Sequence, residues 1–436
     1  MKPTIVRTIP PLAFAAFGAI LLFGGGPAAG QSGAAPPPLR LWPRYVKMDS
    51  WNVKLPVPRS TEIADVGFTG RHAAYEHADT WYPSWASDGH LYSPWTDGKV
   101  AGMECSSGGK DARTGQARIE GDDPLNLKIV NLGTFPGSPL PYEGRYPCGS
   151  LVKDGVWYYG TYTLLDNPAW SMNWPILGPF VGFRVSRDFG KTWEQPAPDA
   201  SRPLFGEKTS VERAEPVKIG SPHFVDFGRN MEHSPDGKAY LVAHGASAPD
   251  KEPRVGNLSW ISGDEIYLAR VRPSPAAIND PRSYEFFAGT AAGGKPVWSG
   301  DLGRIRPIFS WNNHCGCVTM TYDAPLKRYL MCITDGWPTI KSMDTYILES
   351  AEITGPWKLV AYWQNFGPQA YFVHIPSKFI GPDGRSAWLS YSANFTYAQD
   401  DPAYQGNPPG SGYQWCLHEI RLLDQAGYEA VKKAGN

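Results

Sequence analysis

Two aspartates flank a hairpin signal that lies between aromatic runs. Asp88-Gly89 is a strong two-residue turn signal, and Trp and Tyr are frequent on both sides of it. Asp79 precedes Asp88 by nine positions and Asp97 follows it by nine. Paired strands would therefore place the two carboxylates opposite each other, with Cβ atoms about 5 Å apart. Like charges this close raise the pKa of one acid, so the pair suits general acid–base chemistry.

The same hairpin pattern recurs along the chain. An apolar strand, an Asp-Gly turn and an aromatic strand appear at Asp88-Gly89, Asp154-Gly155, Asp236-Gly237 and Asp383-Gly384, with a degenerate copy at 322–325. Five copies predict an all-β fold, a single β-propeller with five blades; six or seven blades are the alternatives. Each turn would join the innermost strand of a blade to its second strand. The extended segment Ile63–Phe68 would complete the last blade and close the ring.

Further strands and one motif support this prediction. Outer strands are expected at Phe180–Val185, Glu265–Val271, Asp344–Glu349 and Tyr413–Leu422, and a short helix at Leu423–Lys433. Residues 186–193 fit the Asp-box pattern Ser-x-Asp-x-Gly-x-Thr-Trp. In such a turn the Ser and Asp side chains bond to the backbone and Gly takes a left-handed conformation. Asp188 is therefore expected to be structural.

The N-terminal region predicts export. Residues 1–30 combine Lys2 and Arg7, an apolar run and a small-residue cut site before Gln31, which is typical of a secretory signal peptide. An uncleaved anchor is the alternative, but the apolar run is shorter than the ~20 residues that span a bilayer. Residues 31–60 read as a Pro-rich linker and N-terminal extension, and residues 61–436 as the catalytic propeller. The protein is expected to be secreted or periplasmic.

Charge and cysteine usage limit the partners. Loss of the leader shifts the net charge from −1 to about −3, and no basic stripe predicts a nucleic-acid partner. No membrane is expected after cleavage, and we expect a monomer. Six cysteines in an exported chain suggest disulfides. We expect one bridge among Cys315, Cys317 and Cys332, with Cys105–Cys148 as a weaker pairing. No metal site is predicted; Ca²⁺ in the central channel is compatible with the sequence but not required.

The segments opposite the five turns should form the mouth of the propeller. The substrate-binding candidates there are Trp81, Arg145, Tyr146, His223, His244, Asn312, His314, Asp335, Trp337, His374 and Asn394, with Tyr371 beside them. Polar groups can bind sugar hydroxyls, and aromatic faces can pack on the C–H side of a sugar ring. Each of these residues also has a structural alternative, since histidines near strand ends and aromatic residues in blades often serve packing alone.

Paired carboxylates at a sugar-binding mouth predict glycoside hydrolysis. One acid would protonate the leaving oxygen, while the other would activate water or attack the anomeric carbon. Separation of the two carboxyl groups decides between retention and inversion. Because Asp side chains are short and Gly98 leaves room beside Asp97, inversion is favoured. The expected substrate is a plant or microbial polysaccharide or oligosaccharide.

The first hairpin also resembles a known family. The run from Asp79 to Gly98 is similar to the first blade of exported bacterial propellers that include the endo-D-arabinanases of mycobacterial arabinan breakdown. Further similar stretches are Tyr284–Gly289, Tyr322–Leu330, Gly355–Trp357 and Ile375–Gly384. The resemblance implies inverting glycoside hydrolases that use two aspartates of the first blade, at the positions of Asp79 and Asp97. Asp-box sialidases are more distant, because their three-arginine clamp has no match here.

Two other functions remain open. A polysaccharide lyase acting on rhamnose–glucuronate glycans would need a cation for the uronate and a His or Tyr base, and Arg145, Tyr146, His223 and His314 are candidates. A non-catalytic glycan-binding propeller would use the same mouth without turnover. An unsaturated, ultraviolet-absorbing product would identify the lyase, and binding without turnover would identify the binding module.

Overall fold

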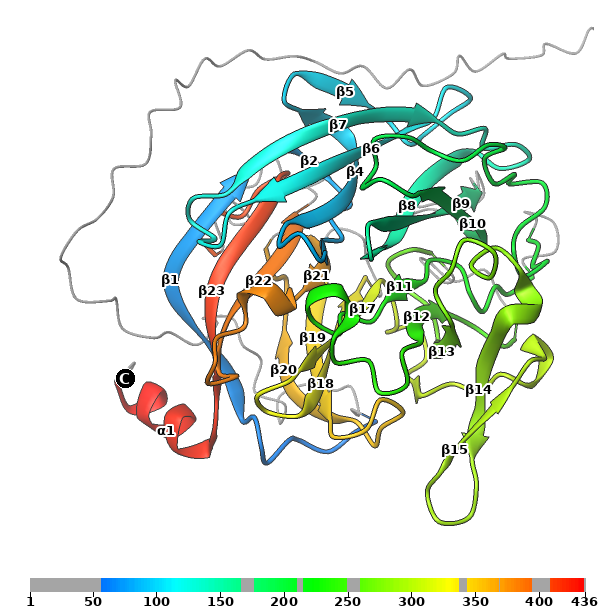
Figure 1. Cartoon of the computed structure of the whole chain (residues 1–436). Helices are drawn as coiled ribbons and strands as arrows, with labels where there is room; N and C mark the ends of the chain where they lie inside the picture. The colour runs from blue at the N-terminus through cyan, green and yellow to red at the C-terminus, as the bar shows by residue number, and fades with distance from the viewer. Residues whose placement is uncertain are drawn as a thin grey trace, which may run out of the picture. The chain divides into compact units, whose positions relative to one another are not determined.

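Short antiparallel strands make up nearly all of the regular structure. The computed structural model describes residues 56–165, 176–209, 215–248, 259–336, 343–367, 369–393 and 408–434. Five sheets stand around a common axis as the five blades of a β-propeller (Figure 1), which confirms the predicted fold and blade count. The predicted signal peptide and most of the predicted linker lie outside the described residues.

Each blade is built from strands that are close in sequence, except the last. Blade 1 contains β2 (His77–Asp79), β3 (Ser84–Trp85), β4 (Leu91–Val100), β5 (Met103–Cys105), β6 (Arg113–Glu120) and β7 (Lys128–Pro136). Blade 2 contains β8 (Gly144–Lys153), β9 (Val156–Leu165) and β10 (Ile176–Ser186). Blade 3 contains β11 (His223–Phe224), β12 (Ala239–Gly245), β13 (Glu265–Val271), β14 (Tyr284–Thr290), β15 (Pro296–Ser299) and β16 (Phe309–Ser310).

The last two blades complete the ring. Blade 4 contains β17 (Val318–Asp323), β18 (Arg328–Asp335), β19 (Asp344–Ser350) and β20 (Lys358–Trp363). Blade 5 contains β21 (Ala370–His374), β22 (Ser386–Ala393), β23 (Trp415–Leu423) and β1 (Asp65–Tyr75). The only α-helix within the described residues is α1 (Gln425–Ala434). Short 3-10 helices occupy Arg229–Met231, Pro281–Ser283, Leu302–Arg304 and Ser377–Phe379. Within the described ranges, no helix combines the length and the apolar character that crossing a membrane requires.

The Asp-Gly turns join the first two strands of their blades, as predicted. In blade 2, Asp154 and Gly155 have φ angles of 53° and 81°, and they connect the paired residues Lys153 and Val156. A two-residue hairpin turn that matches the twist of its strands needs positive φ at both positions, which Gly adopts freely and Asp tolerates. The Asp-Gly dipeptide therefore determines the turn conformation, and the turn determines how β8 and β9 pair.

Blade 5 closes the ring by pairing the two ends of the described chain. β1 lies antiparallel to β23, with Asp65 opposite Leu423 and Tyr75 opposite Trp415, so the predicted closing strand is confirmed. A buried lysine joins the same blade to blade 1: Lys378 Nζ donates to the carbonyls of Gly89 and Gly121, each at 2.7 Å. Closure thus combines a strand pairing with a polar contact at the turn end.

The segment Asp226–His233 links blade 3 to all other blades. The Arg229 guanidinium donates to the Ser87 carbonyl of blade 1, and Asn230 Nδ2 donates to Asp154 Oδ1 of blade 2 at 2.7 Å. Asp226 N donates to the Met320 carbonyl of blade 4 at 2.9 Å, and its carboxylate accepts from Ser377 N of blade 5 at 2.7 Å. This segment therefore crosses the turn end of the propeller axis.

The predicted disulfides are wrong. All six cysteines are described and all are free. Cys315 and Cys317 pack in the core cluster that blade 4 shares with blade 3, whereas Cys332 packs in the cluster that it shares with blade 5. The thiols have other partners: Cys315 Sγ donates to the Trp311 carbonyl at 3.4 Å, and Cys317 Sγ donates to the Trp260 carbonyl at 2.7 Å. Cys105 and Cys148 likewise remain unpaired thiols.

The turn at 186–193 has a dense set of side-chain bonds. Asp188 Oδ1 accepts from Thr192 N at 2.8 Å, and Ser186 Oγ accepts from Gly190 N at 2.8 Å. Gly190 has a φ of 85°, and Trp193 packs against Trp157 with ring centroids 5.4 Å apart. Asp188 is thus committed to its own turn, and these bonds hold its pKa low, at about 2.

Candidate active site

A β-bulge at the open end of the first hairpin places the two aspartates. Asp79 pairs with Thr96 rather than with Asp97, while the preceding pair in the ladder follows the predicted register. Asp97 and Gly98 therefore both oppose Ala78. One extra residue on one strand bends it and redirects its side chains. The predicted direct pairing of Asp79 with Asp97 is therefore wrong by one residue, but the two acids remain neighbours.

Positive φ angles occur at Thr80, directly after β2, and at Asp97 within β4. Thr80 has a φ of 61° and Asp97 a φ of 48°, a region that non-glycine residues rarely occupy and that costs about 1–3 kcal/mol per residue. Thr80 Oγ1 donates to Asp79 Oδ1 at 2.8 Å. Such strain persists only where the surroundings impose it, and it concentrates at functional sites.

Asp79 is buried, with 8% of its surface exposed, and two tyrosines from blade 5 surround its carboxyl group. The Tyr371 hydroxyl lies 2.5 Å from Oδ2, and the Tyr413 hydroxyl lies 3.1 Å from the same oxygen. Tyr413 also donates to the backbone carbonyl of Asp97 at 2.6 Å. Burial, and then the charge of Asp97, raises the pKa of Asp79 to about 8, so this acid keeps its proton at neutral pH.

Asp97 has a different environment. Its Oδ1 accepts from Ser107 N at 2.7 Å, and its Oδ2 accepts from the Ser107 hydroxyl. Burial raises the pKa of Asp97, but both Ser107 bonds favour the ionised form and oppose that shift. Two neighbouring carboxyl groups with such different partners can carry different protonation states, which is the requirement for an acid and a base at one site.

A second pair of carboxyl groups lies at the corresponding end of blade 4. Asp335 on β18 stands directly opposite Asp344 on β19, and the Tyr362 hydroxyl lies 2.7 Å and 3.0 Å from their Oδ2 atoms. His314 Nδ1 is 2.6 Å from Asp335 Oδ2, and the imidazole stacks on Trp311 with centroids 4.1 Å apart. Burial, and then the charge of Asp335, raises the pKa of Asp344 to about 8.

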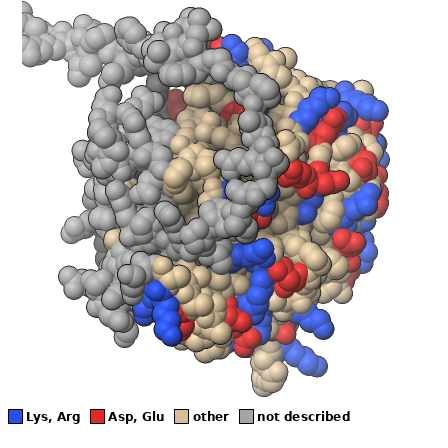
Figure 2. Space-filling view, turned by 90° about the vertical axis from the view of Figure 1, so that its left-hand side faces the viewer, with Lys and Arg blue, Asp and Glu red and all other residues tan. Residues whose placement is uncertain are grey.

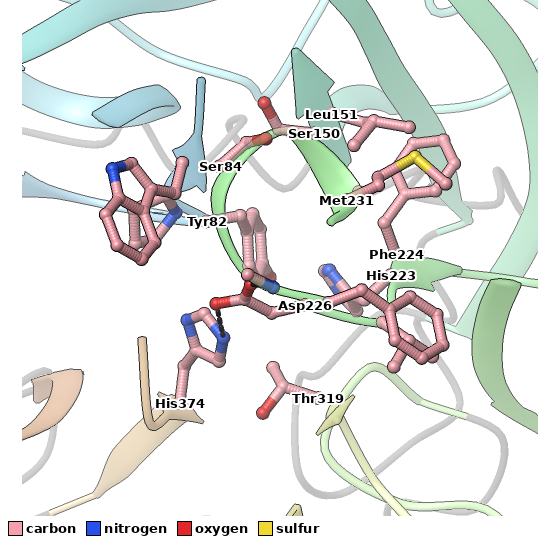
Figure 3. Close-up of a pocket in the computed structure, with 16 residues that line it drawn as sticks. Tyr82, Ser84, Ser150, Leu151, His223, Phe224, Asp226, Met231, Thr319 and His374 are labelled. Atoms are coloured by element: carbon pink, nitrogen blue, oxygen red, sulfur yellow. Dashed lines mark hydrogen bonds and ion pairs between the residues drawn. The ribbon is translucent and has the colours of Figure 1, made fainter. Parts of the chain in front are cut away.

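Two of the predicted histidines line a pocket on the propeller axis (Figure 3). All five blades contribute to its wall, through residues 82–85, 149–151 and 223–228 together with Thr319 and His374. His223 packs against Tyr82 with ring centroids 4.0 Å apart, and His374 Nε2 lies 3.8 Å from Asp226 Oδ2. The Nδ1 atoms of both histidines have no hydrogen-bond partner among the described residues. Burial lowers the pKa of both imidazoles, to about 3 for His374.

Three predicted substrate contacts are instead part of the protein interior. Trp81 stacks on Trp415 at 5.6 Å, and His244 is fully buried with its Nε2 3.0 Å from a backbone carbonyl. Arg145 donates to Thr161 Oγ1 at 2.7 Å and to two backbone carbonyls. These side chains stabilise blades, so the prediction that they line the mouth is not supported by their positions.

The remaining predicted residues are scattered. Tyr146 is half-buried beside Tyr162, with ring centroids 5.6 Å apart, and Asn312 is exposed. Trp337 and Asn394 lie outside the described residues. Sequence reasoning missed four residues that hold the acids and histidines in place: Ser107, Asp226, Asp344 and Tyr413. The strand-end position of Tyr413 was its only signal.

Buried neutral histidines should make the protein sensitive to acid. Burial lowers the pKa of His374 and of His418 to about 3 each, against about 6.5 in the unfolded chain. Their contribution to stability is therefore complete above pH 6.5 and is lost as pH falls toward 3. We expect His374→Gln to flatten the fall in unfolding free energy between pH 6.5 and 4 in urea titrations. His90→Gln, at a less buried histidine, is the control, and equal slopes in both variants would contradict the prediction.

The described surface adds little to the site. On the part of the face in Figure 2 that is not drawn grey, basic and acidic side chains lie interspersed and form no continuous basic tract. Within the described ranges, no group of three or more His, Cys, Asp or Glu side chains is arranged to hold a metal ion.

Solved structures resemble this chain, whereas family models and curated sequences do not match it. Among solved structures, a GH43_1 enzyme from Xanthomonas citri is similar at 14% identity and a TM-score of 0.43, covering 82% of this chain and 92% of that one. A family 117 glycoside hydrolase from the marine bacterium Zobellia galactanivorans has 10% identity and a TM-score of 0.44, covering 84% and 92%. An exo-1,5-alpha-L-arabinanase from a bovine ruminal metagenomic library has 12% identity and a TM-score of 0.40, covering 81% and 97%. At identities and scores this low, only the chain's own residues can say what its site does.

Proposed function

We propose that the protein is a secreted or periplasmic glycoside hydrolase that uses Asp79 and Asp97 in an inverting mechanism. The observation that carries this proposal is the pair of neighbouring acids at the bulge, one buried among hydroxyl groups and one held by Ser107. Asp79 would be the general acid that protonates the leaving oxygen. Asp97 would be the general base that takes a proton from water as its oxygen attacks the anomeric carbon.

The proposed substrate is a polysaccharide or an oligosaccharide. The resemblance of the first hairpin to endo-D-arabinanases makes an arabinan-type glycan the first candidate. The leader-like N-terminal sequence would bring the enzyme to such a substrate outside the cytoplasm. We propose that it acts as a monomer, because each blade of the ring finds its partners within one chain.

A substrate panel tests the proposal. The purified protein and its Asp97→Asn variant are incubated with arabinan, rhamnogalacturonan and plant gum, and new reducing ends are measured. We expect release by the parent and a loss of about 10²–10⁴-fold in the variant, which is the usual contribution of a positioned acid or base. Proton NMR of the first product should show the anomer opposite to that of the substrate. Full activity in the variant would remove Asp97 from the mechanism.

Polysaccharide lyase activity is the second candidate, and the His314–Asp335 pair favours it. A carboxylate that holds Nδ1 fixes the imidazole tautomer and leaves Nε2 free to take a proton. The His314 side chain keeps 11% of its surface exposed. Against this candidate, Arg145, the predicted uronate partner, is committed to interior bonds. Ultraviolet absorbance of an unsaturated product in the same panel would decide for the lyase.

A further inference from the structure

We infer that Tyr413 is a positioning residue whose oxygen accepts the proton of Asp79 Oδ2 and so makes Asp79 the acid of the pair, while the Tyr371 hydroxyl donates to the same oxygen and fixes its orientation. This inference rests on the proposed function for its catalytic meaning, but the placement of the proton can be tested without any substrate. The placement of the proton follows from counting the hydrogen-bond donors and acceptors of the two tyrosine hydroxyl groups and the Asp79 carboxyl group.

Tyr413 has one hydroxyl hydrogen and two acceptor oxygens within hydrogen-bond distance, and the Tyr371 hydroxyl is a third neighbour. Its oxygen lies 2.6 Å from the Asp97 carbonyl and 3.1 Å from Asp79 Oδ2. A carbonyl can only accept, so the shorter contact takes the Tyr413 hydrogen. The longer contact is then attractive only if Asp79 supplies the hydrogen and a lone pair of the Tyr413 oxygen accepts it. An ionised Asp79 would instead face that lone pair.

Tyr371 completes the arrangement. Its hydroxyl donates to the same Asp79 oxygen at 2.5 Å, and a protonated carboxyl oxygen can accept one bond while it donates another. The Tyr371 ring is fixed against Trp260, with centroids 5.0 Å apart, and against Phe372 at 4.7 Å. The Tyr413 ring packs against His77 at 5.2 Å. Both hydroxyl groups are therefore held in place by ring packing before any ligand arrives.

The wider surroundings provide no counter-charge. Asp97 and Thr80 face Asp79 from blade 1. The other buried titratable groups near enough to interact with an ionised Asp79 are uncharged tyrosine and cysteine side chains: Tyr82, Tyr162, Cys105 and Cys317. Among the described residues, no Lys or Arg forms an ion pair with Asp79. A buried carboxyl group without a cation is more stable protonated.

In the proposed reaction the two aspartates move protons, and the Tyr413 hydroxyl changes its hydrogen-bond partner. As the glycosidic C–O bond breaks, the proton of Asp79 moves to the leaving oxygen, while water forms the new C–O bond and gives a proton to Asp97. Asp79 is then an anion, and the Tyr413 hydroxyl can rotate its hydrogen from the Asp97 carbonyl toward Asp79. Exchange with solvent returns one proton to Asp79 and removes one from Asp97, so the cycle consumes one water.

Titration of Asp79 tests the inference directly. The full-length protein is labelled with ¹³C at the Asp carboxyl, and the Asp79 signal is identified by its loss in Asp79→Asn. In Tyr413→Phe we expect the acid dissociation constant of Asp79 to increase about tenfold, because the acceptor for its proton is gone. In Tyr371→Phe it should decrease, because a donor to the anion is lost. Tyr391→Phe is the control, since that buried hydroxyl bonds to Ser411 at 2.6 Å instead.

The sign of the change decides the outcome. A smaller or unchanged dissociation constant in Tyr413→Phe would mean that Tyr413 donates to an ionised Asp79, and the inference would be wrong. Turnover on the polysaccharide panel is measured separately. Full activity in Asp79→Asn would overturn the proposed function and leave the proton placement intact, so the two failures are distinguishable.

Discussion

Replacing Asp79 by Asn is expected to lower turnover sharply and to make the protein more stable at pH 8. The folded protein raises the pKa of Asp79 to about 8, whereas the unfolded chain loses this proton near pH 3.9. Between these values the folded state binds one proton more than the unfolded state, so stability falls as pH rises. The slope is about 1.4 kcal/mol per pH unit, or on the order of 5 kcal/mol across the window.

Asparagine has nearly the same shape and no charge to bury, so it escapes this loss. Urea unfolding of the parent and of Asp79→Asn at pH 5, 6.5 and 8 should show a stability difference that widens with pH. Asp344 adds its own pH dependence to both proteins, so the difference isolates Asp79. Turnover should fall about 10²–10⁴-fold. The exposed Asp383, replaced by Asn, is the control. A variant less stable than the parent at every pH would contradict the buried, protonated acid.

Local signals were sufficient to predict the fold. Asp-Gly turns, alternating aromatic strands and the closing strand beside β23 all depend on short stretches whose backbone preferences are strong. Asp154 and Gly155 have positive φ, a conformation that the Asp-Gly dipeptide predicts without any information from the rest of the chain. The disulfide prediction failed because residue spacing does not reveal which groups a buried cysteine side chain contacts.

The acid pair was predictable only in part. Counting outward from Asp88 assumes that each residue of one strand is opposite a single residue of the other. The bulge at Asp97 and Gly98 breaks this assumption. Tyr371 and Tyr413 contact Asp79 from 292 and 334 residues away in sequence, and no local pattern connects such positions. His244 and Trp81 were predicted at the mouth from residue type and from their place opposite the turns, but neither distinguishes a ligand contact from interior packing.

The second carboxylate pair shows a related limit. Asp335 and Asp344 are opposite each other on neighbouring strands, as Asp79 and Asp97 were expected to be. An Asp-Gly dipeptide begins at Asp335 itself, but none lies midway between Asp335 and Asp344, so the sequence did not indicate that these two acids pair. In blade 4 one tyrosine hydroxyl contacts both carboxyl groups, whereas the Tyr413 hydroxyl contacts the carboxyl group of Asp79 and the backbone carbonyl of Asp97. Recognition of acid pairs from sequence therefore depends on the turn between them more than on the acids.

Gly98→Ala is expected to separate the two acids and to lower kcat/KM at least about 100-fold. A Cβ at Gly98 would lie 2.0 Å from the His77 carbonyl oxygen and 2.7 Å from the Ala78 Cα. Both are backbone atoms of β2, so no side-chain rotation relieves the contact. β2 and β4 must move apart at the bulge, where Asp79 follows Ala78 directly. A displacement of about 1 Å in a catalytic group can cost 10²-fold in rate.

A matched substitution separates this effect from a general loss of stability. At Gly300 an added Cβ would meet no atom closer than 4.0 Å, so Gly300→Ala should keep parental turnover. Folding of both variants is checked by circular dichroism before the rates are compared. Because Asp97 then stands farther from Asp79, the ¹³C titration should also show a lower pKa for Asp79 in Gly98→Ala. Parental turnover and an unchanged titration in a folded Gly98→Ala variant would show that the bulge does not set the geometry of the acid pair.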